Sequence, residues 1–327
     1  MGAVATEIVC EVSCNHLQDY SRALRLVDAA VAAGADAIKL QVDDPEFGLT
    51  IDCDAEPFRI KSGQPWAGRT LHDLYRETYT PWEWVPKLMR YSPIPVFATP
   101  SCLSGVVFLE TCGVTRYKVS SFEVTDVPLL RAIARTHKPV MVSLGCATGE
   151  DIETVVDIIG WRRLTLMHCV SKYPTEATEA SLGRIPQLAR DLGIPVGLSD
   201  HTLGDFVPTL AVACGAVAIE KHLTLSRADG GPDAGFSMEP AEFAEMVCKV
   251  RLAEQAMEVR KVEPDRQFVK SLFVVRDVAA GELFTTANVG VIRPGHGLHP
   301  ALLDSVLGKR AARDVKRGEP MAMEMFT

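Results

Sequence analysis

The chain has little of what marks a secreted, membrane-bound or nucleic-acid-binding protein. Its nine cysteines are scattered without a C-x-x-C pair, which is typical of free thiols. No apolar run approaches the roughly 20 residues that span a bilayer, and the first segment, MGAVATEIVC, lacks the basic and apolar regions of a signal peptide. The formal net charge of −8 disfavours nucleic acid as a partner. We therefore expect a cytoplasmic protein that binds neither membranes nor nucleic acid.

The chain also lacks a G-x-G-x-x-G motif after its first apolar segment, which disfavours a dinucleotide-binding fold. It has instead a series of short apolar runs that alternate with helical patterns such as residues 20–33. Eight such runs predict an α/β fold, a (β/α)8 TIM barrel, with an open doubly wound sheet as the alternative. The runs are residues 7–13, 36–41, 94–100, 116–121, 138–145, 164–171, 194–200 and 216–222.

The pattern predicts more than one domain. We expect a catalytic barrel over residues 1–256, a charged linker over residues 257–270 and a small β-rich domain over residues 271–327. A long insertion, residues 42–93, separates the second and third predicted strands and contains three of the four tryptophans. Because long loops at the carboxyl ends of barrel strands shape substrate sites, we expect the insertion at that rim.

Polar side chains gather where the predicted strands end, which is where barrel enzymes place their sites. His201 and His222 end the seventh and eighth strands, and neighbouring strands lie about 4.8 Å apart. Both imidazoles are therefore expected to reach one divalent cation, for which imidazole is a common ligand. The alternative is a pair of hydrogen-bonded rim histidines.

Two lysines lie inside predicted strands. The residues that flank Lys39 and Lys118 are apolar, so both stems are expected to be buried, and a buried lysine needs a partner or an anion. One interpretation is an internal ion pair with Glu11 or Glu123. The other, favoured by the hydroxyl groups predicted at the same rim, is a pocket for an anion.

At these positions the sequence resembles the sialic acid synthase family, which condenses phosphoenolpyruvate with an amino sugar to make a nine-carbon 2-keto acid. The resemblance implies a TIM barrel followed by a small antifreeze-like (SAF) domain. Within the family, the sequence is most similar to the pseudaminic acid synthase branch, through GRTLHDLYRETYTPWEW and DGGPDAGFSMEP. The wider matches are NH at 15–16, AGADAIKLQ, YKVSSFEVTDVPLLRAIA, GLSDHTLG, EKHLTL and RPGHGLHP.

The resemblance implies a particular reaction. A synthase of this branch would condense phosphoenolpyruvate with the open-chain aldehyde of a 2,4-diacetamido-2,4,6-trideoxy hexose and release phosphate. The N-acetylneuraminate and legionaminate branches are alternatives. A metal-dependent barrel hydrolase and a non-catalytic carbohydrate-binding paralogue are alternatives of other kinds.

The resemblance also implies roles for single positions. His201 and His222 match the ligands of a divalent ion, usually Mn²⁺ or Mg²⁺. Arg293, in IRPG, matches an arginine that the small domain lends to the active site of the partner subunit, which implies a domain-swapped homodimer.

The remaining matched positions lie mostly at the predicted strand ends. Those that match catalytic positions are Asn15, Lys39, Lys118, Tyr173 and Asp233, and those that match substrate-binding positions are Gln41, Ser121, Ser143, Ser171, Ser199 and Arg293. The chain departs from the family's pattern at other positions, which bear on the choice of acceptor sugar. These are Leu17, Ser101, Leu144 and Cys146.

Overall fold

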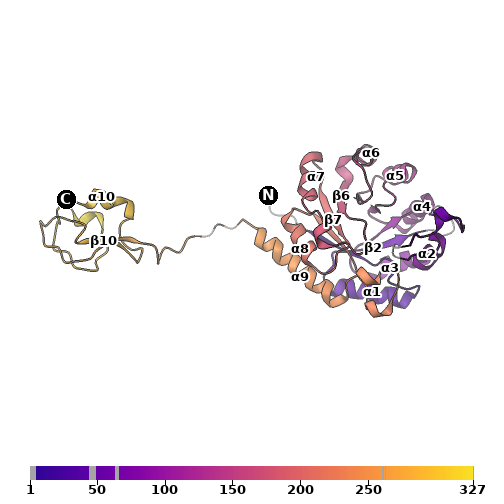
Figure 1. Cartoon of the computed structure of the whole chain (residues 1–327), viewed down its shortest axis with the longest axis horizontal. Coiled ribbons are helices and arrows are strands. Elements are labelled where there is room, and N and C mark those ends of the chain that lie inside the picture. Colours follow the sequence, from indigo (N-terminus) through magenta and orange to yellow (C-terminus); the bar gives the residue numbers. More distant parts are fainter. Residues whose placement is uncertain (1–4, 44–48, 63–65, 260, 262, 327) are drawn as a thin grey trace. The chain divides into compact units, whose positions relative to one another are not determined.

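The computed structural model describes residues 5–43, 49–62, 66–259, 261 and 263–326. The chain separates into two compact units, residues 1–258 and residues 259–327, each with its own hydrophobic core (Figure 1). Within the described part of the chain, no helix is both long enough and apolar enough to cross a membrane.

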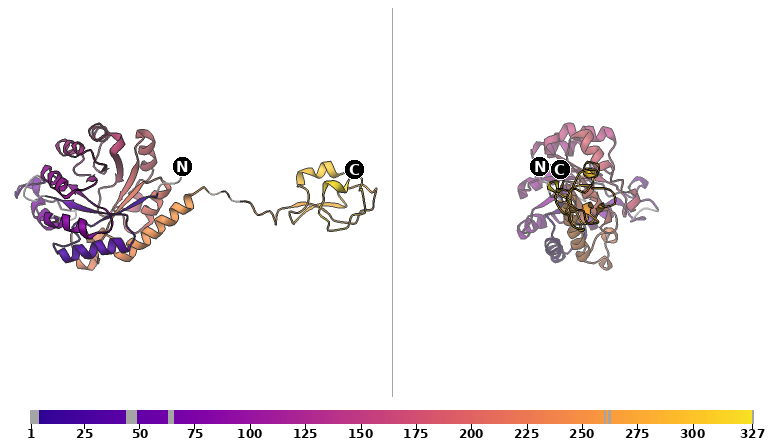
Figure 2. Two further views of the ribbon diagram at one scale, coloured as in Figure 1. Left: turned by 180° about the vertical axis from the view of Figure 1, so that it is seen from behind. Right: turned by 90° about the vertical axis from the view of Figure 1, so that its left-hand side faces the viewer.

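The first unit is a closed barrel of eight parallel strands in sequence order, which confirms the predicted (β/α)8 fold. Each strand lies inside the segment predicted for it, except that β2 extends one residue beyond the predicted end. Helices surround the strands, as the front and back views show (Figures 1 and 2). The strands are β1 (Glu7–Glu11), β2 (Ala37–Val42), β3 (Val96–Pro100), β4 (Tyr117–Val119), β5 (Val140–Ser143), β6 (Leu164–Cys169), β7 (Val196–Asp200) and β8 (Ala218–His222).

The helices follow from capping residues and apolar spacing. Helix α1 (Tyr20–Ala32) begins after Asp19, whose side chain accepts a hydrogen bond from the backbone N–H of Ser21. Its apolar residues recur at helical spacing and are buried against the strands. The other helices of this unit are α2 (Leu71–Thr78), α3 (Val85–Tyr91), α4 (Leu103–Cys112), α5 (Val127–Arg135), α6 (Gly149–Ile159), α7 (Arg184–Leu192), α8 (Phe206–Ala213) and α9 (Pro240–Met257), with 3₁₀ turns η1 (Glu56–Phe58), η2 (Trp82–Trp84), η3 (Trp161–Arg163), η4 (Ala177–Glu179), η5 (Arg227–Asp229) and η6 (Ala234–Phe236).

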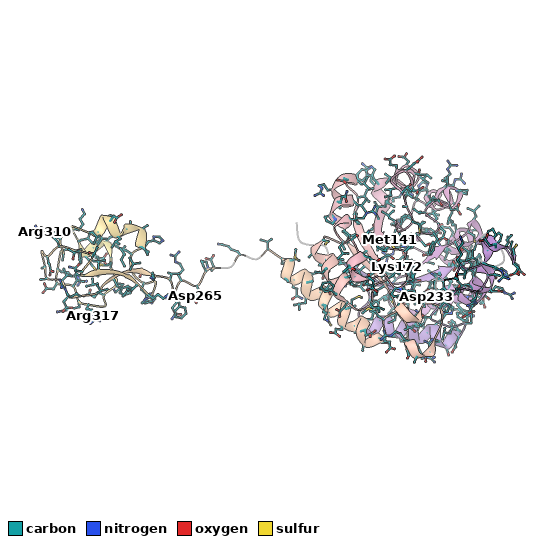
Figure 3. All side chains as sticks on the ribbon, viewed as in Figure 1. Met141, Lys172, Asp233, Asp265, Arg310 and Arg317 are labelled. Carbon is teal, nitrogen blue, oxygen red and sulfur yellow. The ribbon has the colours of Figure 1, made fainter. Side chains whose placement is uncertain are left out.

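Inward-facing side chains fill the barrel in layers, because successive residues of a strand point to opposite faces. An apolar layer closes the interior towards the amino ends of the strands. A Cβ atom on Gly197 of β7 would lie 2.7 Å from both the Ala218 carbonyl oxygen and Met167 Sδ, so only glycine leaves room for Met167 there. This lower layer consists of Val9, Ala37, Phe97, Met141, Met167 and Ala218, of which Met141 is labelled in Figure 3.

The insertion between β2 and β3 packs on the rim at the carboxyl ends of the strands, as the sequence predicted. Trp82 Nε1 donates to the carbonyl oxygen of Asp43 at 2.8 Å, directly after β2. Trp66 Nε1 donates to the carbonyl oxygen of Pro232 at 3.0 Å, in the segment after β8. The insertion is therefore tied to two sides of the same opening.

The second unit is built around one antiparallel pair of strands, β9 (Ser271–Val274) and β10 (Val289–Ile292). Isolated bridges, such as that between Val278 and Val315, extend the β structure. The helical segments are short, in agreement with the small β-rich domain that the sequence predicts. They are η7 (Pro300–Leu302), α10 (Leu303–Val306) and η8 (Met323–Met325).

Candidate active site

Four charged side chains meet inside the barrel, beyond the lower layer. Glu11, Lys39, Lys118 and Glu220 are each no more than 4% exposed. Lys39 Nζ lies 2.5 Å from Glu11 Oε2 and 3.6 Å from Glu220 Oε1. Lys118 Nζ lies 3.8 Å from Glu220 Oε2. We call these four residues the charged layer, in which two lysines face two glutamates.

Burial and pairing set the pKa values of the charged layer. Burial opposes the charged form of Lys39, but Glu11 and Glu220 outweigh it and raise the pKa of Lys39 to about 12. Burial raises the pKa of Glu11 to about 7, against the opposing effect of Lys39. Burial lowers the pKa of Lys118, whose carboxylate partner is more distant. Lys118 is therefore the more weakly compensated cation, and the one better suited to meet an external anion.

The ion-pair interpretation of Lys39 describes the structure, with Glu11 as the partner. Glu123 is engaged elsewhere, since its carboxylate accepts a hydrogen bond from the Ser120 hydroxyl. The pair does not exclude an anion pocket, because Lys118 lies in the same interior without so close a carboxylate.

Hydroxyl groups at the strand ends contact the charged layer. A hydroxyl both donates and accepts hydrogen bonds. It can therefore bond to the lysines and glutamates when no anion is bound, and it can donate to the oxygen atoms of an anion that binds. Three of them touch the layer directly. Ser143 Oγ accepts from Lys118 Nζ at 2.6 Å, Thr99 Oγ1 accepts from Lys39 Nζ at 3.2 Å, and Ser199 Oγ donates to Glu220 Oε1 at 3.2 Å.

Gly145, which follows β5, makes room for two further hydroxyls. Its backbone N–H donates to Ser121 Oγ at 3.0 Å. A Cβ atom on Gly145 would lie 2.2 Å from Ser171 Oγ and 2.9 Å from Ser121 Oγ. Ser121 and Ser171 are thus brought together beside β5, and the glycine between them was not singled out from the sequence.

His201 and His222 lie side by side at the ends of β7 and β8, with ring centroids 5.4 Å apart. Burial lowers the pKa of His201 to about 4 and that of His222 well below its usual range. Both rings are therefore neutral, and each has one nitrogen with a free lone pair. His201 Nδ1 lies 3.2 Å from the carbonyl oxygen of Val170, which places the proton on Nδ1 and leaves the lone pair of Nε2 free.

The residues around this pair fit a divalent cation. His222 Nδ1 is buried and has no hydrogen-bond partner among the described residues, although Asp233 Oδ2 lies 3.7 Å away. An unsatisfied buried nitrogen is costly, and a cation would satisfy the pair of rings. Within the described ranges, no three His, Cys, Asp or Glu side chains form a ready-made cage, so further ligands would be water or substrate.

Aromatic rings border the two histidines. The Tyr173 ring lies 4.4 Å from His201 and 5.2 Å from Phe236, and Phe236 lies 5.0 Å from His222. Burial raises the pKa of Tyr173 far above its usual value, so its hydroxyl remains a hydrogen-bond donor. Trp66 of the insertion lies 6.4 Å from Tyr173. Phe236 was not anticipated, because an apolar residue beside a rim carries no chemical motif.

Asp233, labelled in Figure 3, is bound by a residue that sequence reasoning missed. The Ser13 hydroxyl donates to Asp233 Oδ2, and Ser13 Oγ also lies 3.3 Å from Gln41 Oε1. Burial raises the pKa of Asp233. Gln41 and Asp233, which were predicted separately, therefore meet at one serine.

Asn15 lies at the rim, and its amide nitrogen is already engaged. Its Nδ2 donates to the Leu223 carbonyl oxygen and to Ser237 Oγ, both at 2.9 Å. Its Oδ1 is buried without a partner among the described residues. The main visible role of Asn15 is to join the loop after β1 to the segment after β8.

Arg293 belongs to the second compact unit of the chain and not to the unit that contains the barrel. It is exposed, and its Nε donates to the carbonyl oxygen of Phe268 at 2.6 Å. An arginine has five N–H donors, so several remain for a ligand.

The departures from the family's pattern occupy different environments. Leu17 packs on the loop that carries Asp233, since a Cβ atom on Gly231 would lie 2.6 Å from Leu17 Cδ2. Ser101 and Leu144 are buried, and Cys146 is exposed.

Comparison with known proteins identifies both units. Residues 26–261 match the NeuB family, and residues 269–327 match the SAF domain. The chain belongs to the NeuB family. This membership confirms the resemblance that the strand-end motifs indicated.

Similar proteins in this family carry specific names. The pseudaminic acid synthase of Campylobacter jejuni is 38% identical over 331 residues, which cover 98% of this chain and 96% of that protein. The N,N'-diacetyllegionaminic acid synthase of the same species is 30% identical over 328 residues, 96% of this chain and 98% of that protein. The crystal structure of N-acetylneuraminic acid synthetase from Leptospira borgpetersenii, in complex with citrate, covers 80% of this chain and 88% of its own, with 32% identity and a TM-score of 0.70.

Proposed function

We propose that this chain is a phosphoenolpyruvate-dependent synthase that makes a nine-carbon acid of the pseudaminic acid type from an open-chain 2,4-diacetamido-2,4,6-trideoxy hexose, with release of phosphate. Its similarity to pseudaminic acid synthase over almost the whole length supports this choice of product. One structural observation carries the proposal. A buried layer with two lysines lies inside the barrel, and a pair of neutral histidines lies at the ends of the strands beyond it.

The charged layer and its hydroxyls provide for phosphoenolpyruvate. Lys118 supplies a weakly compensated positive charge, and Lys39 remains protonated because its pKa is raised. Around them, the hydroxyl groups are able to donate to phosphate and carboxylate oxygens. Such groups act by holding the anion in one orientation, which removes much of the entropic cost of the reaction. The hydroxyl donors are Thr99, Ser121, Ser143, Ser171 and Ser199.

The rim provides for the sugar. His201 and His222 would hold a divalent cation, Mn²⁺ or Mg²⁺, which when bound supplies Lewis-acid polarisation of a carbonyl oxygen. Tyr173 donates a hydrogen bond from a hydroxyl that stays protonated. Asp233 accepts hydrogen bonds from the sugar, or a proton, at its carboxylate.

The overall conversion balances with water as the one further reactant. The methylene carbon of phosphoenolpyruvate forms a bond to the aldehyde carbon of the sugar, whose oxygen takes up a proton. Water adds to the former enol carbon, and the tetrahedral intermediate loses phosphate to give the 2-keto acid. The barrel residues align the two carbons and stabilise the charges that develop.

The second unit is proposed to complete the site of a partner chain. Arg293 is exposed and has donors to spare, which suits an arginine that contacts a sugar bound elsewhere. We therefore propose a domain-swapped homodimer in the cytoplasm, with no membrane or nucleic-acid partner.

The test is turnover of phosphoenolpyruvate with a panel of 2-acetamido and 2,4-diacetamido sugars, followed by phosphate release and product mass. We expect phosphate only when both substrates are present, and a product heavier than the sugar by one pyruvic acid. A 2,4-diacetamido-6-deoxy acceptor of the pseudaminic type should give the highest kcat/KM, and preference for the legionaminic epimer would assign the chain to that branch. Hydrolysis of phosphoenolpyruvate or sugar alone would indicate a hydrolase, and binding without turnover would indicate a carbohydrate-binding protein.

A further inference from the structure

Ser13 lies at a junction of three segments that surround the proposed sugar site. It follows β1, its side chain contacts Gln41 on β2, and it contacts Asp233 in the segment after β8. The residue is fully buried, with 0% exposure. Its backbone N–H donates to Glu11 Oε1 at 3.0 Å, which ties the same residue to the charged layer.

Counting protons fixes the direction of these hydrogen bonds. A serine hydroxyl carries one proton, so Ser13 is unable to donate both to Asp233 and to Gln41. The Ser13 hydroxyl donates its proton to Asp233 Oδ2, so that proton is not available to Gln41. Nitrogen and oxygen of a glutamine amide are interchangeable in shape, and a reversed Gln41 amide donates from Nε2 to Ser13 Oγ. The consistent chain runs from Gln41 through Ser13 to Asp233.

This direction has a consequence for Gln41. With Nε2 turned towards Ser13, Oε1 of Gln41 faces away from the serine. That oxygen then becomes an acceptor for a hydroxyl or acetamido N–H of a bound sugar. Asp233, fixed at the other end, stays near His222, with Oδ2 3.7 Å from Nδ1.

The backbone of Ser13 supports a specific role for the residue. Its φ of 49° lies in the left-handed region, which is uncommon for residues other than glycine. Glycine would adopt this conformation without strain but would lack the hydroxyl. Such conformations persist where the surrounding structure holds them, often at functional sites.

We propose that Ser13 is a positioning residue of the synthase, whose hydroxyl orients both the Gln41 carbonyl and the Asp233 carboxylate towards the acceptor sugar. The proposal rests on the proposed function. It assigns to Ser13 an effect on the sugar and not on phosphoenolpyruvate, because its side-chain contacts go to rim residues.

Two variants separate the hydroxyl from the backbone. Ser13→Ala removes the hydroxyl and keeps the strained φ, whereas Ser13→Gly removes the hydroxyl and relieves the strain. We expect both to lower kcat/KM for the sugar about 10- to 100-fold, the range found when a group that orients a metal ligand is lost. The dissociation constant of phosphoenolpyruvate, measured by calorimetry, should change less than about twofold.

The matched control is Thr6→Val, which removes a buried hydroxyl that donates to the Ala216 carbonyl oxygen before the first strand. Its kinetic constants should equal those of the unsubstituted chain. If Ser13→Gly has full activity, the backbone alone matters and the proposal is overturned. Equal losses in sugar and phosphoenolpyruvate binding would also overturn it, because they indicate general damage to the barrel.

A double-mutant cycle tests the hydrogen bond itself. Ser13→Ala should have little further effect on kcat/KM in an Asp233→Ala background, which lacks the acceptor, and additive losses would contradict the proposed hydrogen bond. The same cycle measured by urea unfolding does not depend on turnover. If the unsubstituted chain fails to condense any sugar, the proposed function fails, while coupling in unfolding still reports whether Ser13 positions Asp233; its absence overturns the proposal.

Discussion

Lys39 and Glu11 form an ion pair inside the barrel, with 2.5 Å between Lys39 Nζ and Glu11 Oε2 and neither residue more than 3% exposed. Removing one partner of such a pair leaves a buried charge poorly compensated. At pH 8, above the raised pKa of Glu11 of about 7, we expect Glu11→Gln to lower the free energy of unfolding by about 3 kcal/mol, measured by urea denaturation.

The control for this prediction is Glu245→Gln. Glu245 pairs with Lys249 at 2.8 Å on an exposed helix face, where such pairs contribute between about 0 and 1 kcal/mol. A Glu11→Gln variant as stable as the control would show that Lys39 does not depend on Glu11.

Lys118 is predicted to be the main cation for phosphoenolpyruvate. Lys118→Ala should weaken phosphoenolpyruvate binding at least about tenfold in calorimetry, because a charge-assisted hydrogen bond contributes about 1.5–3 kcal/mol. Lys249→Ala, on the surface, should leave the affinity unchanged. Unaltered affinity in Lys118→Ala would refute the assignment of the anion to the charged layer.

Metal binding is predicted to depend on both strand-end histidines. Dialysis against a chelator should abolish turnover, and Mn²⁺ or Mg²⁺ should restore it. The direct readout is metal content and the visible spectrum of the Co²⁺-loaded chain, which His201→Ala and His222→Ala should lose. His137→Asn, an exposed histidine with a left-handed φ that asparagine tolerates, should retain both. Full activity in a metal-free sample would disprove the metal proposal.

Arg293 is predicted to act on the sugar in a partner's barrel. Arg293→Ala should raise the KM for the sugar and lower kcat while phosphoenolpyruvate still binds. Mixing this variant with Lys118→Ala should recover part of the activity, since each mixed dimer has one intact barrel served by one intact arginine. No recovery after verified subunit exchange would show that the arginine acts within its own chain or has no role.

His16 is predicted to make the fold sensitive to acid. Burial, with a contribution from Arg22, lowers the pKa of His16 from 6.5 to about 4. Its Nδ1 accepts from the Gln18 backbone N–H at 3.1 Å, so the neutral ring donates from Nε2 to Thr80. The folded chain thus binds fewer protons there than the unfolded chain.

The stability that His16 contributes is therefore fully present above pH 6.5 and is lost as the pH falls through about 4. The linked loss reaches about 3 kcal/mol over this window. His16→Gln should make the free energy of unfolding, measured in urea, depend less steeply on pH between pH 7 and pH 4.5. The same pH dependence in the variant and the unsubstituted chain would contradict the prediction.

The barrel could be predicted from the sequence because the pattern of an apolar run followed by a helix repeats eight times. The two lysines could be predicted as site residues because a positive charge within an apolar strand is unusual. Ser13 gave no such signal. A single serine is common, its φ is invisible in a sequence, and its partner Asp233 lies 220 residues away. Gly145 was not predicted for a similar reason, since it acts by having no side chain beside Ser121 and Ser171.

The position of Lys39 was predicted, but the balance of charges around it was not. Whether a buried lysine meets a carboxylate or leaves its charge for a ligand depends on distances of a few ångströms between strands. The sequence offered both Glu11 and Glu123 as partners, and only the packing of the strands decides for Glu11.

The lower layer limits how molecules reach the interior of the barrel. Met167, packed against Gly197, helps to fill the interior at the amino ends of the strands, so in the proposed arrangement the reactants reach the charged layer from the carboxyl ends, where the two histidines lie. In the proposed arrangement the anion sits deeper than the sugar. We therefore expect phosphoenolpyruvate to bind before the sugar.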